Sequence, residues 1–349
     1  MLFIIFLFII YISCIKLRKH EKFTNYRKIS VIKKKILFDK LVLNTFFDNS
    51  TYLNIGKNLN KIFPFYEIKL SGGSFSNINL TNKYSNYLSL VQDDAYFNFI
   101  KNNKNNDLRY LLSIGVEQFT LITKRNSSIK SWNDLRFKNI GSLNQKTASN
   151  FVLQKIIKSF RLQSKIITCD ISSISKFLSN GDIDAFFMVI SNPNSLFRKI
   201  NKQIPLKFIG FNDLDKNILN KIFPFANKAK IDVNEYNIPS LNTINTLETK
   251  INMICNKNLD PEHSYNLIKT IFSKLLFIKT NGDNDFKLQM KEFNPSYLYP
   301  VNSLYKLHEG VHKFYIDIGV ITYKDDTSCK YTVGIKKCRG QNINNFKLI

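Results

Sequence analysis

Residues 66–100, YEIKLSGGSFSNINLTNKYSNYLSLVQDDAYFNFI, alternate between short apolar runs and longer segments with helical spacing. The run at 66–70 leads into the turn SGGS at 71–74, which is followed by a helix-period segment. A second strand-like run at 88–91 is followed directly by the polar triplet QDD at 92–94 and another helical segment. Strands that alternate with helices are typical of a parallel sheet with helices on both faces. The stretch therefore predicts an α/β fold.

The same alternation extends in both directions along the chain. A strand-like run at 35–44 precedes the stretch, and a break at 126–128 opens a second β/α series. Polar turns follow the strands, at the end where open α/β sheets bind ligands. Because no long Pro/Gly-rich linker separates the two series, we expect two lobes that exchange chain segments. The predicted organisation is a signal segment at 1–14, a basic linker at 15–35, lobe 1 at 36–122 plus 256–321, lobe 2 at 123–255 and an irregular basic tail at 322–349.

The composition is that of a globular protein with a strong basic bias. Hydrophobic residues make up 44% of the 349 residues, and 51 Lys and Arg outnumber 26 Asp and Glu, which gives a net charge of +25. Such a charge permits a nucleic-acid or anionic-membrane partner. The lysines are scattered among Asn, Ile and Phe, however, which share A/T-rich codons, whereas basic footprints normally cluster on one face or one helix. We therefore expect no nucleic-acid partner and keep polyanion binding as an alternative.

The N-terminus indicates export. Residues 2–12 form an almost uninterrupted apolar run, which is short for a bilayer span but suits the core of a signal peptide. Ser13 directly precedes Cys14, as lipoprotein processing requires, so Cys14 is a candidate lipidation site. No Lys or Arg stands ahead of the run and a basic cluster follows it, so an uncleaved signal anchor is the alternative. We expect a periplasmic or other extracytoplasmic location, either free or membrane-anchored.

Six motifs follow one another along residues 36–320 in an order that is more specific than any one of them. They are SGGS at 71–74 with Asn77, LVQDD at 90–94, SIKSWNDL at 128–135, GDIDAFF at 181–187, SNPN at 191–194 and HEGV at 308–311. In this order they resemble the TAXI family of solute-binding proteins, the extracytoplasmic receptors of a class of TRAP transporters. The resemblance implies a type II periplasmic-binding-protein-like fold, with two α/β lobes whose mixed, mainly parallel sheets are joined by hinge strands.

The same resemblance implies a function. Lobe closure would capture a glutamate- or glutamine-like amino acid or a dicarboxylate, and the receptor would deliver it to an ion-gradient-driven TRAP transporter. The expected partners are thus a small-molecule solute and the membrane component of that transporter, and we expect the receptor to act as a monomer. No enzymatic activity and no cofactor are expected.

The turns that face the predicted cleft supply the candidate ligand-binding residues. Helix N-termini offer N–H groups without an internal partner and a dipole that favours anions. Glycines let the backbone approach a ligand closely, and serines cap or donate. A carboxylate such as Asp93 would hold a ligand ammonium. The candidates are Ser50, Thr51, Tyr52, Ser71, Gly72, Gly73, Ser74, Asn77, Gln92, Asp93, Thr147, Ala148, Ser149, Phe187 and Asn192.

Alternatives remain at the level of residues and of function. Tyr52 also suits core packing, and Gln92 and Asp93 also suit helix caps. We expect hinge strands near residues 119–123 and 251–255. An enzyme on the same fold is the second alternative function, because fold does not fix function. No nucleophile–base pair, metal-ligand set or GxSxG motif stands at a strand end, so we assign no catalytic or metal-binding residues.

Overall fold

The computed structural model describes residues 41–48, 50–238, 243–291, 293, 295–299, 305–321, 330–332 and 335–337. The predicted signal segment with Cys14 and the linker 15–35 lie outside these residues, as does most of the tail 322–349. Within the described ranges, no helix is both long enough and apolar enough to cross a membrane.

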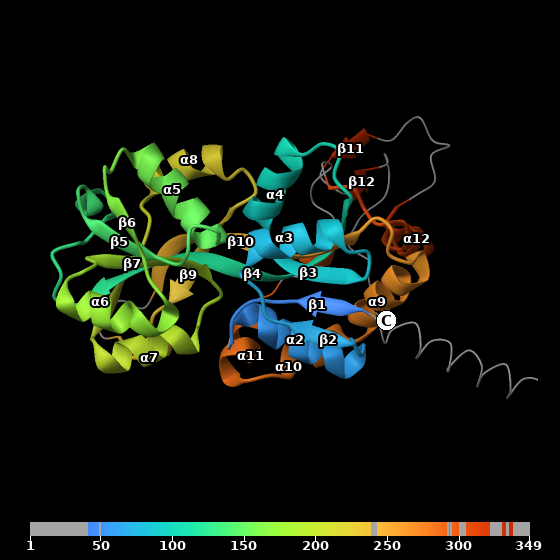
Figure 1. The fold of residues 1–349 in the computed structure, drawn as a ribbon, viewed down its shortest axis with the longest axis horizontal. Coiled ribbons are helices and arrows are strands. Elements are labelled where there is room, and N and C mark those ends of the chain that lie inside the picture. The colour runs from blue at the N-terminus through green and yellow to red at the C-terminus, as the bar shows by residue number, and fades with distance from the viewer. Residues whose placement is uncertain are drawn as a thin grey trace, which may run out of the picture.

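One sheet of ten strands runs through the molecule, with helices on both of its faces (Figure 1). The order along the sheet is β2-β1-β3-β10-β4-β7-β5-β6, and β8 pairs with β4 and β9 with β10. A separate two-stranded pairing joins β11 (Lys330–Thr332) to β12 (Ile335–Lys337).

We call one end of the sheet lobe 1. Its strands β1 (Val42–Asn44), β2 (Glu67–Lys69) and β3 (Tyr87–Gln92) are parallel. The helices that follow them are α2 (Thr51–Ile62), α3 (Ser74–Lys83) and α4 (Asp93–Asn102). In α2 the buried side chains Tyr52, Ile55 and Leu59 recur at helical spacing, so one apolar stripe faces the sheet.

The other end is lobe 2, in which β5, β6 and β7 are parallel to one another. Its strands are β5 (Asn139–Ser142), β6 (Lys165–Thr168), β7 (Ala185–Ile190), β8 (Leu206–Ile209) and β9 (Asn227–Asp232). Its helices are α5 (Ala148–Phe160), α6 (Ile174–Asn180), α7 (Ser195–Gln203) and α8 (Asp213–Ile222), with short 3-10 turns at Trp132–Leu135, Ile171–Ser173 and Asn234–Tyr236.

Two long antiparallel strands, β4 (Leu108–Lys124) and β10 (Thr243–Asn256), run through both lobes. In β4, residues 118–123 pair with β7 of lobe 2. In β10, residues 251–255 pair with β3 of lobe 1, and residues 243–248 pair with β9 of lobe 2. The segments expected as hinges therefore lie inside the lobes, and the crossing between lobes occurs near residues 115–118 and 248–251.

The chain then returns to lobe 1. Its last helices are α9 (Pro261–Ser273), α10 (Leu275–Thr280), α11 (Asn284–Lys291) and α12 (Glu309–Asp317), with a 3-10 turn at Pro295–Leu298. They pack with α2 on an apolar core that includes Leu59, Ile268 and Phe286. Asp260 caps α9 and Pro261 is its first residue, as expected for a residue without an N–H group.

This architecture confirms the predicted fold class, an α/β type II periplasmic-binding-protein-like fold with a mixed sheet. The sheet is continuous through both lobes and is not mainly parallel, because the long strands β4 and β10 pair antiparallel with their neighbours. Some element bounds differ from the expected ones. The strand predicted at 35–44 is described only as Val42–Asn44, because residues 35–40 lie outside the described ranges.

Candidate functional site between the two lobes

The carboxyl ends of the parallel strands of both lobes point at the junction between the lobes. Strand β3 ends at Gln92, which pairs with Ile251, and β7 ends at Ile190, which pairs with Gln118. Both partners lie where β4 and β10 cross from one lobe to the other. Ligands of open α/β sheets bind beyond the carboxyl ends of the strands. The junction is therefore the candidate site.

Helix N-termini from both lobes surround this junction. Ser50 caps α2 by accepting a hydrogen bond from the Leu53 N–H at 3.2 Å, and Thr147 caps α5 by accepting one from the Asn150 N–H at 3.3 Å. Gly73 precedes α3 with a φ of 97°, and an added Cβ would lie 3.1 Å from the Phe46 ring. A side chain at position 73 would therefore be strained both by the positive φ and by its contact with the Phe46 ring.

Hydrogen bonds within lobe 1 fix the loop that follows β2. The Ser71 hydroxyl donates to the Thr45 carbonyl oxygen at 2.8 Å. The Asn77 amide donates to the carbonyl oxygens of Thr45 and Leu90, each at 2.8 Å. Because these donors are already used, Ser71 and Asn77 hold the loop against β1 and β3. Of the other residues predicted here, Gly72 is exposed and the backbone of Gly73 turns the chain into α3.

Tyr52 and Glu117 form a buried polar pair at the centre of the junction. The Tyr52 hydroxyl donates to Glu117 Oε2 at 2.9 Å and lies 3.4 Å from the Ser74 hydroxyl. Ser74 in turn accepts a hydrogen bond from the Gln92 N–H at 2.9 Å. Burial raises the pKa of Glu117 to about 8, although the hydrogen bond from Tyr52 lowers it. Burial, followed by the charge of Glu117, also raises the pKa of Tyr52 well above its usual value.

Two carboxyl groups begin α4. Asp93 accepts hydrogen bonds from the Tyr305 hydroxyl at 2.5 Å and from the Asn252 amide. Asp94 accepts one from the Gln92 side chain at 2.6 Å. Burial raises the pKa of Asp94 to about 7 against the effect of this hydrogen bond, and Asp93 adds to the rise. Burial also raises the pKa of Asp93.

Sequence reasoning missed Asp94 and Glu117. Asp94 belongs to the polar triplet that was singled out after the second strand, so its signal was present. Glu117 is the one acidic residue of β4, and a lone acid in a mostly buried strand is the feature that identifies it.

The ligand-binding candidates predicted in lobe 2 have different surroundings in the structure. Ser149 and Ala148 lie at the start of α5, where the Ser149 hydroxyl accepts from the Val189 N–H at 3.1 Å. Ala148 packs with apolar side chains of lobe 1 such as Ile78 and Val91. The Asn192 amide donates to the Thr120 hydroxyl at 2.9 Å, and its oxygen accepts from the Tyr236 hydroxyl at 2.6 Å.

Phe187 does not face the junction cavity. It is fully buried and packs against Trp132, with ring centroids 5.8 Å apart, and against Phe119, at 6.3 Å. Its place is the lobe 2 core, so the expectation that it closes the pocket is wrong for this structure. The neighbouring position on β4, Phe119, lines the cavity instead.

The two lobes are in contact across the junction. Phe75 of α3 meets Phe151 of α5 with ring centroids 5.6 Å apart, and Phe97 of α4 meets Phe225 of lobe 2 at 4.8 Å. On the other side of the sheet, Arg198 of α7 pairs with Asp285 of α11 at 2.7 Å. The structure thus shows the lobes closed on each other.

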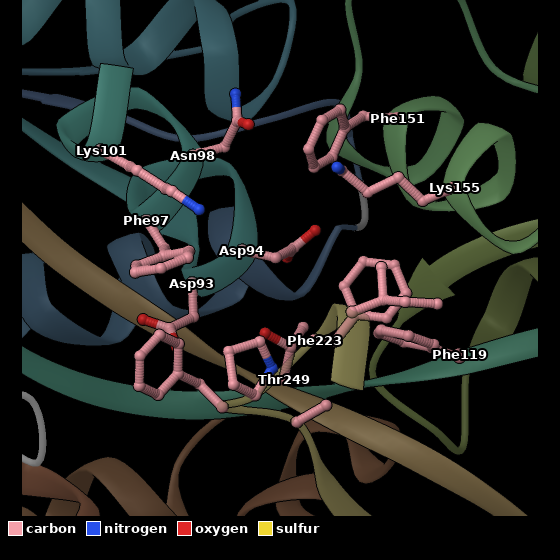
Figure 2. Close-up of a pocket in the computed structure, with 14 residues that line it drawn as sticks. Asp93, Asp94, Phe97, Asn98, Lys101, Phe119, Phe151, Lys155, Phe223 and Thr249 are labelled. Carbon is pink, nitrogen blue, oxygen red and sulfur yellow. The ribbon is translucent and has the colours of Figure 1, made fainter. Parts of the chain in front are cut away.

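A cavity lies between the lobes, with about 560 Å³ of space not filled by protein atoms, including the part open to solvent (Figure 2). Lobe 1 contributes residues of α4, and lobe 2 contributes residues of α5, of α8 and of the loop after α8. The crossing strands form its floor through Phe119 and Thr249. The volume that is comparable with published cavities is about 100 Å³, below the roughly 300–1,000 Å³ of drug-sized ligand sites, so this arrangement admits only a small ligand.

The described ranges contain no group of three or more His, Cys, Asp or Glu side chains placed to hold a metal ion. Cys169 and Cys255 are buried and free.

Comparison with known protein families finds a match over residues 49–319, well over half of the chain, to the NMT1-like family. The chain belongs to the NMT1-like family. The narrower TAXI assignment stays a prediction, since the matching family is described only as NMT1-like. No curated protein matches the chain significantly.

Solved structures with similar folds are distant in sequence. One is a putative L-cystine ABC transporter protein from Listeria monocytogenes, with 15% identity, a TM-score of 0.43 and coverage of 74% of this chain and 97% of that one. Another is the periplasmic aliphatic sulphonate binding protein SsuA from Escherichia coli, with 13% identity, a TM-score of 0.42 and coverage of 75% and 82%. A third is the arginine-, lysine-, histidine-binding protein ArtJ from Geobacillus stearothermophilus, with 14% identity, a TM-score of 0.43 and coverage of 72% and 100%.

Proposed function

We propose that this protein is an extracytoplasmic solute-binding receptor that captures one small molecule between its lobes and delivers it to a membrane transporter. The observation that carries the proposal is the junction cavity, which is walled by both lobes and has Asp93 and Asp94 directly beyond the carboxyl end of β3. A ligand that touches both walls favours the closed state, and a transporter can read that state.

The division into lobes supports this mechanism. The predicted lobe bounds at 122/123 and 255/256 are replaced in this proposal by bounds near residues 115–118 and 248–251, and within the described sheet only β4 and β10 run through both lobes. Hinge closure needs few residues that change conformation. The crossing segments near 115–118 and 248–251 are the proposed hinges, and a register shift after Ile251 gives the ladder an irregularity beside them.

The finer assignments rest on the sequence motifs. We propose a TRAP-type transporter as the partner, because the ordered motifs resemble those of TAXI receptors. Export through residues 1–14, with Cys14 as a lipid anchor, accounts for an extracytoplasmic location. Among the residues predicted to contact the ligand, Asp93 lines the cavity. The helix N-termini at Ser50–Tyr52, Gly73–Ser74 and Thr147–Ser149, with Gln92 and Asn192, stay proposed contacts although they do not line it.

The proposal is tested by thermal unfolding of the purified full chain against a panel of amino acids, dicarboxylates, amines and neutral sugars. Binding to the folded state alone adds about 2.7 kcal/mol at a ligand concentration of 100 times Kd. For a protein of this size that raises Tm by roughly 4 °C or more. A saturable shift from one solute class supports the receptor. A flat panel, with a shift from heparin alone that disappears in salt, would instead indicate polyanion binding through the net charge of +25.

A further inference from the structure

The walls of the junction cavity are aromatic. Phe97 of α4, Phe119 of β4, Phe151 of α5 and the segment that contains Phe223 and Phe225 contribute rings to it (Figure 2). Ring faces offer a large apolar contact area and carry partial negative charge that attracts cations. The walls thus suit the hydrocarbon part of an organic molecule.

The carboxyl groups of the cavity lack counter-charges. Figure 2 shows Asp94 in the middle of the cavity wall. Its Oδ2 atom is buried and has no hydrogen-bond partner, and among the described residues Asp94 forms no ion pair. A buried carboxylate without a partner is costly, so the site favours an arriving cation.

Glu117 places a second acidic group beneath the cavity. It pairs across the ladder with Thr249, and Thr249 and Phe119 both line the cavity. Residues i and i+2 of a strand lie on the same face, so Glu117 shares a face with Phe119. In the described part of the chain, Glu117 also has no ion-pair partner, and its hydrogen bond comes from the neutral Tyr52 hydroxyl.

The basic groups near the cavity stand apart from these two acids. Lys101 and Lys155 lie over the rings of Phe97 and Phe151, 6.0 and 4.8 Å from the ring centroids. Lys250 lies over Tyr297, and its charge acts on Asp93. Lys101 and Lys155 extend toward the cavity from opposite lobes (Figure 2), so they are placed to meet an anionic group at its rim rather than at its base.

We propose that the cavity binds an organic ligand through a protonated amino group, which is held by Asp94, while the ligand body packs on the phenylalanine rings. This inference rests on the proposed receptor function and names its substrate class. A free amine and an amino acid share this chemistry, and the carboxylate of the latter would face Lys101 and Lys155. A dicarboxylate, one of the solutes expected from the sequence, would instead meet the ionised Asp94 as a like charge.

The experiment uses matched ligands that differ only in their charged ends. Isothermal titration calorimetry of the full chain would compare three matched sets. The first is phenethylamine, L-phenylalanine and 3-phenylpropionate, the second is histamine and imidazolepropionate, and the third is cadaverine and glutarate. We expect saturable binding of at least one amine or amino acid and none of its amine-free counterpart. Binding of phenylalanine without phenethylamine would assign the carboxylate to the rim lysines, and binding of both would show that the amine suffices. Binding of a carboxylate without its amine counterpart would overturn the inference.

Substitutions test the role of Asp94. Asp94→Asn is expected to lower the affinity for the amine at least 10-fold. Asp94→Glu keeps the charge and is expected to retain part of the affinity. Asp182→Asn changes an exposed carboxylate at the far end of lobe 2 and should leave affinity unchanged. Unliganded Tm values verify that each variant is folded. Equal affinity of Asp94→Asn and the unaltered protein would contradict the assignment.

The pH dependence adds a second readout. Because the ligand cation needs the ionised carboxylate, amine affinity should rise between about pH 5 and pH 8, as Asp94, whose pKa is about 7, loses its proton. The same rise should be absent in Asp94→Asn. A shift from neutral solutes alone would overturn this inference and leave the receptor function intact, whereas a flat response to every solute would overturn both.

Discussion

Glu117 is a buried acid whose ionisation opposes folding. Its side chain is 6% exposed, and burial raises its pKa to about 8. In the unfolded chain a Glu loses its proton near pH 4.3. Between these values the folded state holds more protons than the unfolded state, so the free energy of unfolding falls as pH rises from about 4.3 to about 8. Above that range the full penalty remains.

Glu117→Gln should remove this penalty while keeping an acceptor for the Tyr52 hydroxyl. We expect the variant to lose less stability than the unaltered protein between pH 5 and pH 8.5, by on the order of a few kcal/mol. Urea unfolding at both pH values measures the difference. Glu67→Gln, at an exposed position on β2, is the matched control and should follow the unaltered protein. Parallel pH curves for the unaltered protein and Glu117→Gln would disprove the assignment.

For single residues, the sequence predicted the positions of turns better than it predicted which way side chains point. Ser50 caps the helix after β1, Ser74 begins the helix after β2 and Gln92 ends β3, so turn chemistry predicted polar residues at these strand–helix connections. Their contact with a ligand stays a prediction. Phe187 lies in the unbroken apolar run AFFMVI, which carries no alternation to show which face it takes. Its burial in the lobe 2 core depends on the partners that tertiary packing supplies.

Among the elements, α12 packs unusually closely on α9. A Cβ at Gly310 would lie 2.0 Å from the Pro261 carbonyl oxygen and 2.2 Å from the Ser264 hydroxyl. Next to it, the Ser264 hydroxyl and His308 Nδ1 are hydrogen-bonded at 2.8 Å. The two helices can approach this far only because position 310 has no side chain.

Gly310→Ala should therefore displace α12. Overpacking costs about 1–3 kcal/mol and more where backbone is in the way, so we expect Tm to fall by more than about 5 °C. Differential scanning calorimetry measures this. Gly72→Ala is the control, because its Cβ would find its nearest neighbour, Ser76 Cβ, at an ordinary 3.5 Å. Similar Tm values for the two variants would mean that α12 adjusts at no cost.

Element types were predictable because local patterns specify them. The helix-period segment after SGGS became α3, and the run before QDD became β3. Which parts of β4 and β10 act as the crossing could not be predicted, because the pairing partners of both strands change along their length. That information is non-local and appears only once the sheet order is known.

At the scale of the whole molecule, the closed arrangement depends on contacts between the lobes that local sequence patterns do not predict. Arg198 of α7 donates from Nε and Nη2 to Asp285 Oδ1 of α11, at 3.1 and 2.7 Å. Gln289 of α11 also donates to the Pro193 carbonyl oxygen at 2.7 Å. These residues are more than 80 positions apart in sequence, and composition alone gives no reason to pair them.

Asp285→Asn should shift the molecule toward an open state, because it removes the charge that holds Arg198 across the junction. Burial raises the pKa of Asp285 while the charge of Arg198 lowers it. The cost of desolvating the two charges therefore offsets part of the electrostatic attraction between them. We expect a loss of about 1–2 kcal/mol from closure, which corresponds to roughly 5- to 30-fold weaker solute binding. Small-angle scattering should show a larger radius of gyration without solute. Asp213→Asn breaks an ion pair within lobe 2, to Lys216, and should change neither quantity. If both variants bind and scatter alike, the Arg198–Asp285 contact does not control closure.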